Sequence, residues 1–377
     1  ATSDANNSTT RDSTVKVVAK LRTHLVLVFG GRSAEHDVSC ATAWHVAAAI
    51  DRSLHDVTVI GITKEGQWKH VSDPFAEANQ DLADNGSLST KGMPINPFDL
   101  VAELSASSSA QIVVVPLLHG PLGEDGTIQG LLEVLDVAYV GSGVLGSALA
   151  MDKSMAKTVA ASAGIPIPRY FTLSSADLQE MASIAQRVEH ELGYPCFVKP
   201  ANMGSSVGVS RVEGPQDLAT AVELAFTFDS SVLVEEGIHG REIEVAVLGN
   251  ESPVAFPPGE VIPADSFYSY SDKYLDGIST CEIPARLPDD ITTEVTDLAV
   301  RVFSALGCSG LARCDFFFEE HGRGVLFNEL NTMPGFTPIS MYPKMVTASG
   351  MTYATLINNL VDLALQRHSS RVRNTGR

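Results

Sequence analysis

The stretch ARCDFFFEEHGRGVLFNELNTMPG, residues 312–335, decides the fold of this chain. Its two apolar runs, separated by a glycine-containing turn, predict a β-hairpin. Glu329 and Asn331 are two positions apart and so share one face of their strand. A turn of odd length centred near Gly322 places Asp315 directly across from Glu329. Three oxygen-bearing side chains therefore converge in a hairpin whose other residues are mostly apolar, aromatic or glycine.

Those three side chains make a candidate site for a divalent cation. Two carboxylates at cross-strand distance repel each other strongly in a low-dielectric environment unless a cation lies between them. Magnesium prefers such oxygen ligands and completes its octahedron with water and substrate phosphates. The alternative is a surface hairpin with solvated acids. Because the acids interrupt apolar runs instead of alternating with them, the sequence favours a metal site at Asp315, Glu329 and Asn331.

Composition limits the classes of function that the chain can have. Its 377 residues, 44% of them hydrophobic, suffice for two or three domains. A net charge of −19 argues against general binding to nucleic acid or to anionic membranes, which depends on clustered Lys and Arg. The 5 cysteines are scattered and form no C-x-x-C pair, so neither a disulfide framework nor a zinc site is expected.

No membrane segment or secretory signal is recognisable in this sequence. The apolar runs are far shorter than the roughly 18 residues that cross a bilayer. Residues 1–23 are polar and lack the apolar centre of a signal peptide. We therefore expect a soluble cytoplasmic protein with polar tails at residues 1–23 and 369–377.

The order of the expected strands and helices predicts an α/β fold that becomes α+β in its C-terminal part. Residues 24–141 alternate strands and helices as a parallel sheet does, with an irregular polar insertion at 64–110. Residues 142–236 alternate again and form a central domain. Residues 237–368 have longer strands, one of them expected at 252–262, then a long helix, the hairpin and two final helices.

Two glycine-containing segments are candidate binding loops. FVKPANMGSSVGVSRV (197–212) predicts a hairpin whose backbone N–H groups and hydroxyls could hold phosphate oxygens, although a flexible turn with a surface lysine is an equal alternative. GSGVLG (141–146) matches G-x-G-x-x-G. It lacks both a clear preceding strand and an acidic residue about 20 positions later, so packing at a domain junction is favoured over a dinucleotide site.

Two further loops follow expected strands, where open α/β sheets bind their ligands. They are GGRSAEHDVS (30–39) and LHGPLGEDG (118–126). Each has an ordinary structural explanation as well. Glu35 can serve as an acid in the first turn of a helix, and Asp125 can cap one.

In order along the chain, GGRSAEHDVS, LHGPLGEDGTIQG, GSGVLGSALAMDK, FVKPANMGSSVGVS, VLVEEGIHGREIEV, SFYSYSDKYL, ARCDFFF and NELNTMPGFTPISMYP closely resemble the D-alanine:D-alanine ligase family of the ATP-grasp superfamily. The resemblance covers roughly residues 24–365. It implies a three-domain ATP-grasp fold with ATP held between the last two domains. It also implies phosphoryl transfer from ATP to one D-alanine and attack by the amine of a second, for peptidoglycan synthesis. A homodimer formed through the N-terminal domain is part of the same implication.

The resemblance also implies roles for individual residues. For metal binding it implies two Mg²⁺ or Mn²⁺ ions held by Asp315, Glu329 and Asn331. For ATP it implies Lys153, Lys199, Ser206 and Lys273 near the phosphates and the covering loop, with Glu235 and Glu242 near adenine and ribose. For the amino acids it implies Glu35 at the first ammonium, His119 nearby, Ser340 and Met341 at the second carboxylate, and Arg313 with the Gly335 N–H at the oxyanion. Activation by K⁺, known in some relatives, is left open.

A tyrosine in the resemblance bears on the second substrate. Tyr274 is implied to form a hydrogen-bonded chain with Glu35 and Ser205, and phenylalanine at that position is associated with D-alanyl-D-lactate, so the dipeptide is expected. Ser269 departs from the aspartate of many relatives. Rival functions are a D-alanine:D-lactate or D-serine ligase, or another ATP-grasp carboxylate-amine ligase. From other classes, the rivals are a nicotinamide-dependent oxidoreductase and a non-catalytic nucleotide-binding module.

Overall fold

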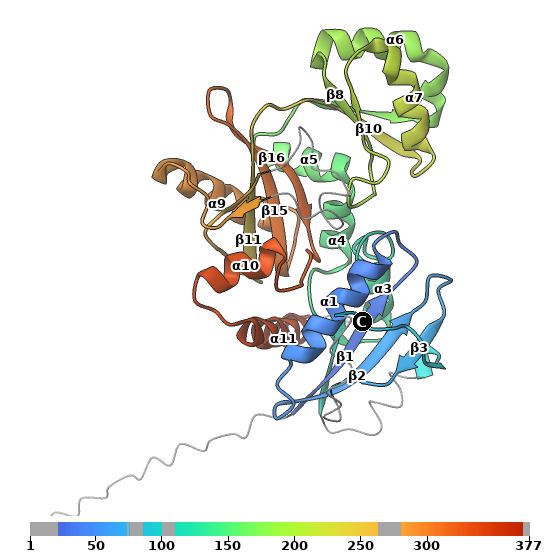
Figure 1. Ribbon diagram of the computed structural model, residues 1–377, viewed down its shortest axis with the longest axis vertical. Coiled ribbons are helices and arrows are strands. Elements are labelled where there is room, and N and C mark those ends of the chain that lie inside the picture. The colour runs from blue at the N-terminus through green and yellow to red at the C-terminus, as the bar shows by residue number, and fades with distance from the viewer. Residues whose placement is uncertain (1–21, 74, 76–85, 100–109, 263–279, 372–377) are drawn as a thin grey trace, which may run out of the picture.

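The computed structural model describes residues 22–73, 75, 86–99, 110–262 and 280–371. Three sheets follow one another along the chain, and each has helices packed against it (Figure 1). We call them, with their helices, the N-terminal body (β1–β6), the central body (β7–β10) and the C-terminal body (β11–β16). In the parts of the chain that the structure describes, no helix is both long and apolar enough to cross a bilayer.

The N-terminal body is built on a sheet whose middle strands are parallel. Its strands are, in spatial order, β4 (Met93–Pro94), β3 (Trp68–Val71), β2 (His55–Ile62), β1 (Thr23–Gly30), β5 (Gln111–Pro116) and β6 (Ala138–Tyr139). Residues Leu25 to Phe29 are all at most 3% exposed, as a strand covered on both faces requires. The predicted α/β class is confirmed here. The expectation of an irregular insertion at 64–110 is wrong in part, because β3 folds back antiparallel on β2 and β4 pairs with β3.

The central body has a small antiparallel sheet with helices on one face. The strands are, in spatial order, β7 (Tyr170–Ser174), β10 (Ser231–Glu236), β8 (Cys196–Pro200) and β9 (Ser210–Val212). The helical elements are η2 (Ser175–Glu180), α6 (Met181–Arg187), η3 (Val188–Leu192) and α7 (Pro215–Phe226). Strands β8 and β9 pair antiparallel around the glycine-serine loop, so the hairpin predicted at 197–212 is confirmed.

The C-terminal body has the longest strands. They are, in spatial order, β14 (Thr280–Glu282), β13 (Gly259–Ile262), β11 (Arg241–Gly249), β15 (Gly310–Glu319) and β16 (Gly324–Asn331), with β12 (Val254–Ala255) beside β11. Its helices are α9 (Asp289–Ala305), α10 (Met341–Ala348) and α11 (Tyr353–Ser370). The single strand expected at 252–262 is two short ones, because Pro257 and Pro258 between them cannot donate ladder hydrogen bonds.

The β15–β16 hairpin pairs Asp315 with Glu329, as predicted, but by a different route. The turn between the strands has the even length of residues 320–323, and the ladder near it pairs Phe316 with Phe327. A β-bulge then leaves Asn328 unpaired and shifts the register by one residue. The bulge, and not an odd turn, therefore brings the two carboxylates opposite each other.

Helices α4 (Val144–Met151) and α5 (Lys153–Ser162) connect the N-terminal and central bodies. A Cβ added at Gly146 would lie 2.6 Å from the carbonyl oxygen of Gly307, so this glycine permits α4 to pack closely on the C-terminal body. The packing role expected for GSGVLG is confirmed.

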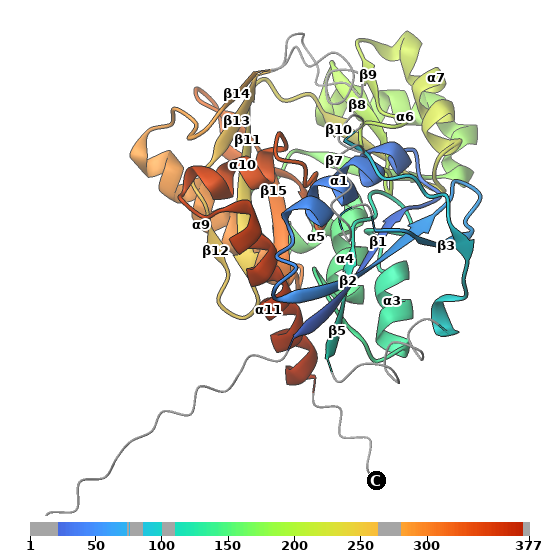
Figure 2. The ribbon, with the colours of Figure 1, turned by 60° about the horizontal axis from the view of Figure 1, so that its bottom comes forward.

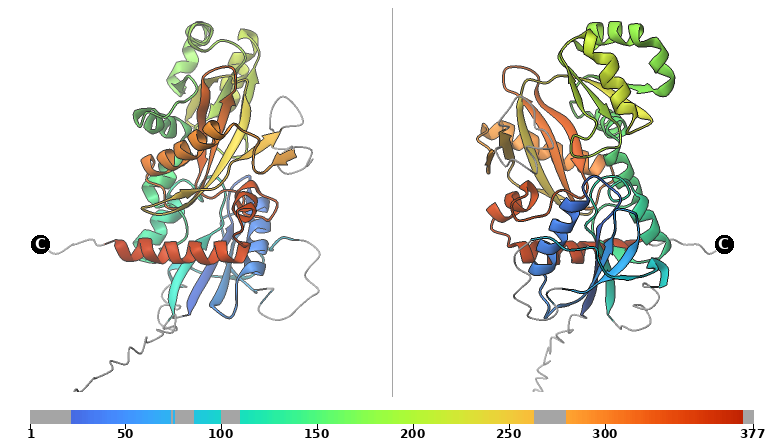
Figure 3. Two further views of the ribbon diagram at one scale, coloured as in Figure 1. Left: turned by 90° about the vertical axis from the view of Figure 1, so that its left-hand side faces the viewer. Right: turned by 45° about the vertical axis from the view of Figure 1, so that its right-hand side comes forward.

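The final helix of the chain covers the first sheet. Leu356, Ile357 and Leu360 of α11 belong to one buried cluster with Leu25 and Leu27 of β1. Figures 2 and 3 show α11 lying beside the N-terminal body, next to α1 (His36–Ala49). Helix α3 (Thr127–Val134) packs instead with the opposite apolar cluster of the sheet, which contains Val26 and Tyr139.

Candidate active site

The end of β10 carries a buried acid between two lysines. Glu235 and Lys157 have side chains that are 1% exposed, and Lys157 Nζ lies 2.8 Å from Glu235 Oε2. Lys199 on the neighbouring strand β8 donates to Glu235 Oε1 at 2.6 Å. Burial alone would raise the pKa of Glu235, but the two ammonium groups outweigh it and lower the pKa to about 2. The two predicted residues, Lys199 and Glu235, therefore lie together as an ion pair.

Lys157 was not among the predicted site residues. Its ammonium also donates to the carbonyl oxygen of Asn328 at 2.9 Å, so it joins α5 to the bulge in β16. Burial lowers the pKa of Lys157. A signal was present in the sequence, because Lys157 is four residues after Lys153 and shares its helix face. Because lysines are scarce in this chain, two of them on one apolar helix face indicate that they bind a partner and are not simply solvated surface residues.

The three predicted metal ligands converge on one face of the third sheet. Asn331 Nδ2 donates to Asp315 Oδ2 at 3.0 Å, and Arg313 donates to both oxygens of Asp315 at 2.7 Å each. Lys153 Nζ lies 3.5 Å from Glu329 Oε2. Two carboxylates and one amide oxygen form the hard donor set that Mg²⁺ and Mn²⁺ prefer, so these residues fit such an ion.

Two features qualify that fit. Among the described residues, no group of three or more His, Cys, Asp or Glu is arranged to hold a metal ion, so an ion held here would take the amide of Asn331 as its third protein ligand. Arg313 also pairs with Glu244, across the ladder from Asp315, at 3.1 Å. Glu244 was missed by sequence reasoning, which selected Glu242, two residues earlier on the same face of β11.

The loop between β8 and β9 reaches the N-terminal body at Glu35. Ser205 Oγ donates to Glu35 Oε1, and Lys153 Nζ donates to the carbonyl oxygen of Met203 at 2.6 Å. A Cβ at Gly204 would lie 2.7 Å from Glu35 Oε2, so a larger residue here would displace the Glu35 carboxylate. Ser205 and Ser206 both have positive φ, 49° and 59°, which turns the loop tightly. Glu35 and Ser205 are thus brought together as predicted.

His119 and Glu124 tie the N-terminal body to the segment after β16. His119 Nδ1 lies 3.0 Å from the carbonyl oxygen of Met333, and the amide of Met333 donates to Glu124 Oε1 at 3.1 Å. Burial, reinforced by the charge of Glu35, raises the pKa of Glu124 to about 8, and burial lowers the pKa of His119. His119 is close enough to Glu35 for the charge of that acid to act on it, and its role near the first substrate stays a prediction. Glu124 lies in the GEDG segment of a loop that the sequence singled out, but the sequence predicted no role for it.

The remaining predicted residues surround the start of α10. A Cβ at Gly335 would lie 3.0 Å from Ser340 Oγ, and that hydroxyl is 2.9 Å from Thr337 Oγ1. Ser340 precedes α10 as its N-cap, and Met341 begins the helix with a buried side chain. The amide groups at a helix N-terminus point outward and attract carboxylates. Lys273 and Tyr274, and with them Ser269, lie outside the described residues.

The comparisons with known proteins agree along nearly the whole chain. Residues 24–142 match the family model "D-ala D-ala ligase N-terminus", and residues 159–362 match "D-ala D-ala ligase C-terminus". The chain belongs to the D-alanine–D-alanine ligase family. Its three bodies therefore form the ATP-grasp fold of that family.

Individual relatives are similar to this chain over nearly their full length. The enzyme of Bacillus velezensis is 46% identical over 91% of this chain and 98% of its own, and that of Natranaerobius thermophilus is 42% identical over 93% and 96%. The structure of the D-alanine-D-alanine ligase from Coxiella burnetii matches with a TM-score of 0.79 at 36% identity, covering 93% and 96% of the two chains. VanG D-Ala:D-Ser ligase from Enterococcus faecalis matches with a TM-score of 0.76 at 34% identity, covering 91% and 99%.

Proposed function

We propose that this chain is an ATP-dependent ligase that joins two D-alanine molecules into D-alanyl-D-alanine. The main support is the convergence of three bodies on one site. The central body supplies Lys199 and Glu235, and the N-terminal body supplies Glu35. The C-terminal body supplies Asp315, Glu329 and Asn331, which we call the acid-amide trio. Such a site can hold a nucleotide and an amino acid at once, as an ATP-dependent ligase requires.

The reaction requires two transfers. An oxygen of the first D-alanine carboxylate attacks the γ-phosphorus of ATP, and the bond from that phosphorus to ADP breaks. The amine of the second D-alanine then attacks the acyl phosphate, phosphate leaves, and the amine loses a proton. Positioning and electrostatic stabilisation dominate phosphoryl transfer of this kind.

The protein residues have distinct tasks in this scheme. Glu35, oriented by Ser205, receives the ammonium of the first D-alanine with His119 nearby. Lys153, Lys199 and the hydroxyl of Ser206 bind phosphate oxygens, and Glu235 and Glu242 lie toward adenine and ribose. Arg313 and the Gly335 amide stabilise the tetrahedral oxyanion. Ser340 and the amide of Met341 bind the second carboxylate. Lys273 and Tyr274 keep the roles that the family resemblance implies.

Asp315, Glu329 and Asn331 would hold the metal ions, two Mg²⁺ or Mn²⁺. Bound there, such ions neutralise the charge on the phosphate oxygens. Cytoplasmic location, a homodimer formed through the N-terminal domain, and a division into domains at 24–141, 142–236 and 237–368 are further parts of the proposal, which rest on the family likeness.

The decisive experiment measures products from the purified chain with ATP, Mg²⁺ and D-alanine. We expect ADP, phosphate and D-alanyl-D-alanine in equal amounts, and no dipeptide from L-alanine. D-lactate and D-serine should be tested in parallel as second substrates. Robust ester formation at neutral pH, or a preference for D-serine, would replace the proposal with one of the related ligases.

A further inference from the structure

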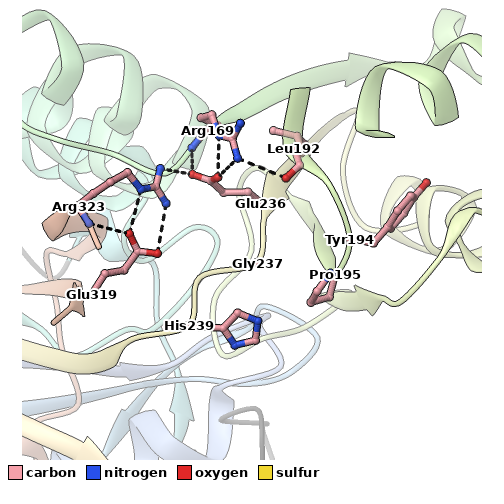
Figure 4. Close-up of a pocket in the computed structure, with 9 residues that line it drawn as sticks. All are labelled: Arg169, Leu192, Tyr194, Pro195, Glu236, Gly237, His239, Glu319 and Arg323. Atoms are coloured by element: carbon pink, nitrogen blue, oxygen red, sulfur yellow. Dashed lines mark hydrogen bonds and ion pairs between the residues drawn. The ribbon is translucent and has the colours of Figure 1, made fainter. Parts of the chain in front are cut away.

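Two adjacent acids at the end of β10 face opposite sides of the central sheet. Glu235 points toward Lys157 and Lys199, on the side of the candidate active site. Glu236 points to the opposite side of the sheet, which we call the rear, toward Arg169 and Arg323 (Figure 4). This alternation is the ordinary consequence of a strand. Here it places one acid on the side of the candidate active site and the next on the side of the two arginines.

The rear acid is held by two arginines. The side chain of Glu236 is 5% exposed and lies 2.6 Å from Arg169 Nη2, and it accepts a hydrogen bond from Arg323 Nη1 at 2.6 Å. The backbone amide of Arg169 donates to it at 2.7 Å as well. Burial alone would raise the pKa of Glu236, but these hydrogen bonds outweigh it and lower the pKa. The carboxylate is thus charged, and its charged form is stabilised by the hydrogen bonds from Arg169 and Arg323.

The two arginines belong to different bodies. Arg169 directly precedes β7, which pairs with β10, so its contact with Glu236 lies within the central body. Arg323 lies in the turn between β15 and β16 and is also bound to Glu319 Oε2 at 2.9 Å. The contact of Arg323 with Glu236 therefore joins the C-terminal body to the central body. Residues 237–240 connect β10 to β11 at the same place.

The junction is open to solvent on its rear side. A cavity of about 530 Å³ is lined there by the four charged residues together with Tyr194, Pro195 and His239, among others. Its presence means that the two bodies are not packed tightly at this point. A rotation that widens the angle between them would draw Arg323 away and leave the buried carboxylate with a single arginine, which is costly.

We propose that Arg323 and Glu236 are positioning residues that hold the central and C-terminal bodies at the angle required to bind the nucleotide. The inference rests on the proposed function, because a nucleotide that contacts both Glu235 and the acid-amide trio must lie between these bodies. The pair acts from the rear, through β10. Neither side chain touches the nucleotide.

The test compares three variants, Arg323→Ala, Arg323→Lys and Arg169→Ala. Binding of ADP with Mg²⁺ is measured by calorimetry without D-alanine, and KM for ATP, KM for D-alanine and kcat are measured separately. Arg323→Ala should weaken ADP binding roughly fivefold and raise KM for ATP by a similar factor. The reason is that a smaller fraction of molecules would hold the central and C-terminal bodies at the angle that binds the nucleotide. KM for D-alanine and kcat should change less than about twofold. Arg323→Lys keeps the charge but loses the planar fork that binds Glu319 and Glu236 together, so it should recover only part of the ADP affinity.

Arg169→Ala is the matched control, since it removes an arginine from the same carboxylate within one body. It should lower the melting temperature but leave ADP affinity within about twofold. In a double-mutant cycle, Arg323→Ala combined with Glu236→Gln should cost no more ADP affinity than the larger single change.

Three results would overturn the inference: unchanged ADP affinity in Arg323→Ala, an equal loss in Arg169→Ala, or additive effects in the cycle. Dipeptide formation by the unaltered protein is recorded independently. A protein that binds ADP but makes no dipeptide would refute the proposed function while the calorimetric comparison still decides the role of Arg323. A protein that does not bind ADP would overturn both.

Discussion

Lys157 and Glu235 form an ion pair of 2.8 Å in which each side chain is 1% exposed. The same ammonium donates to the carbonyl oxygen of Asn328, next to the candidate metal ligand Glu329. One lysine therefore joins the buried acid of the central body to the strand that carries the candidate metal ligands. A buried pair of this kind specifies geometry more than it adds stability.

Replacing Lys157 with Met should strongly destabilise the protein. Glu235 would keep only Lys199 as its counter-ion, and the carbonyl of Asn328 would lose its donor. We expect the free energy of unfolding to fall by about 3–5 kcal/mol. Urea denaturation measures it, and the double variant Lys157→Met, Glu235→Gln should recover part of the loss. A fall of less than about 1 kcal/mol would show that the pair is replaced easily by water.

Glu329→Gln should abolish metal-supported turnover while the fold stays intact. An amide binds a divalent cation more weakly than a carboxylate, so kcat should fall at least about 100-fold at moderate Mg²⁺. ADP release and circular dichroism measure the two properties. Glu320→Gln, an exposed acid in the turn of the same hairpin, is the control. Near-normal turnover in Glu329→Gln would reject its assignment as a ligand.

Glu35→Gln should act on the first amino acid and not on ATP. A charge-assisted hydrogen bond to the substrate ammonium would become a neutral one, and KM for the first D-alanine should rise at least about tenfold. KM for ATP should be unchanged. The exposed Glu65→Gln, which follows the next strand of the same sheet, is the control. Equal changes in both KM values would instead indicate that Glu35 holds the loop at Ser205 and nothing more.

The buried Glu124 predicts how stability depends on pH. Its pKa is raised from 4.5 to about 8 in the folded protein. Between these values the folded state keeps a proton that the unfolded state releases, so this group lowers the free energy of unfolding as pH rises. Its contribution is full below the unfolded pKa and lost once pH passes the folded one. Denaturation of Glu124→Gln at several pH values should show a flatter decline than the unaltered protein, and parallel curves would contradict the pKa.

Residues close in sequence or paired across a strand were predictable, and those joined by tertiary geometry were not. The hairpin itself follows from the pattern of residues. The pairing of Asp315 with Glu329 was predicted from an odd turn, whereas an even turn and a bulge at Asn328 produce it, and the bulge leaves no mark in the sequence. Lys157 was overlooked because a lysine on a helix is usually solvated. That Glu236 faces the opposite side from Glu235 follows from strand alternation, whereas its partner Arg323 is 87 residues away and could not be inferred.

Family likeness supplied what the pattern of residues alone left open. Spacing could not connect Glu35 with Ser205, which are 170 positions apart and belong to different bodies, yet the motifs assigned both to one hydrogen-bonded chain. The roles of Lys273 and Tyr274 stay predictions, since they lie outside the described residues.

Helix α11, the 18 residues from Tyr353 to Ser370, covers a sheet whose first strand begins at Thr23. A ribosome produces β1 long before α11, so the growing chain holds an apolar surface without its cover until translation is nearly complete. A chaperone that shields such surfaces has its longest opportunity here, and a chain truncated before Tyr353 would keep this surface exposed and aggregate.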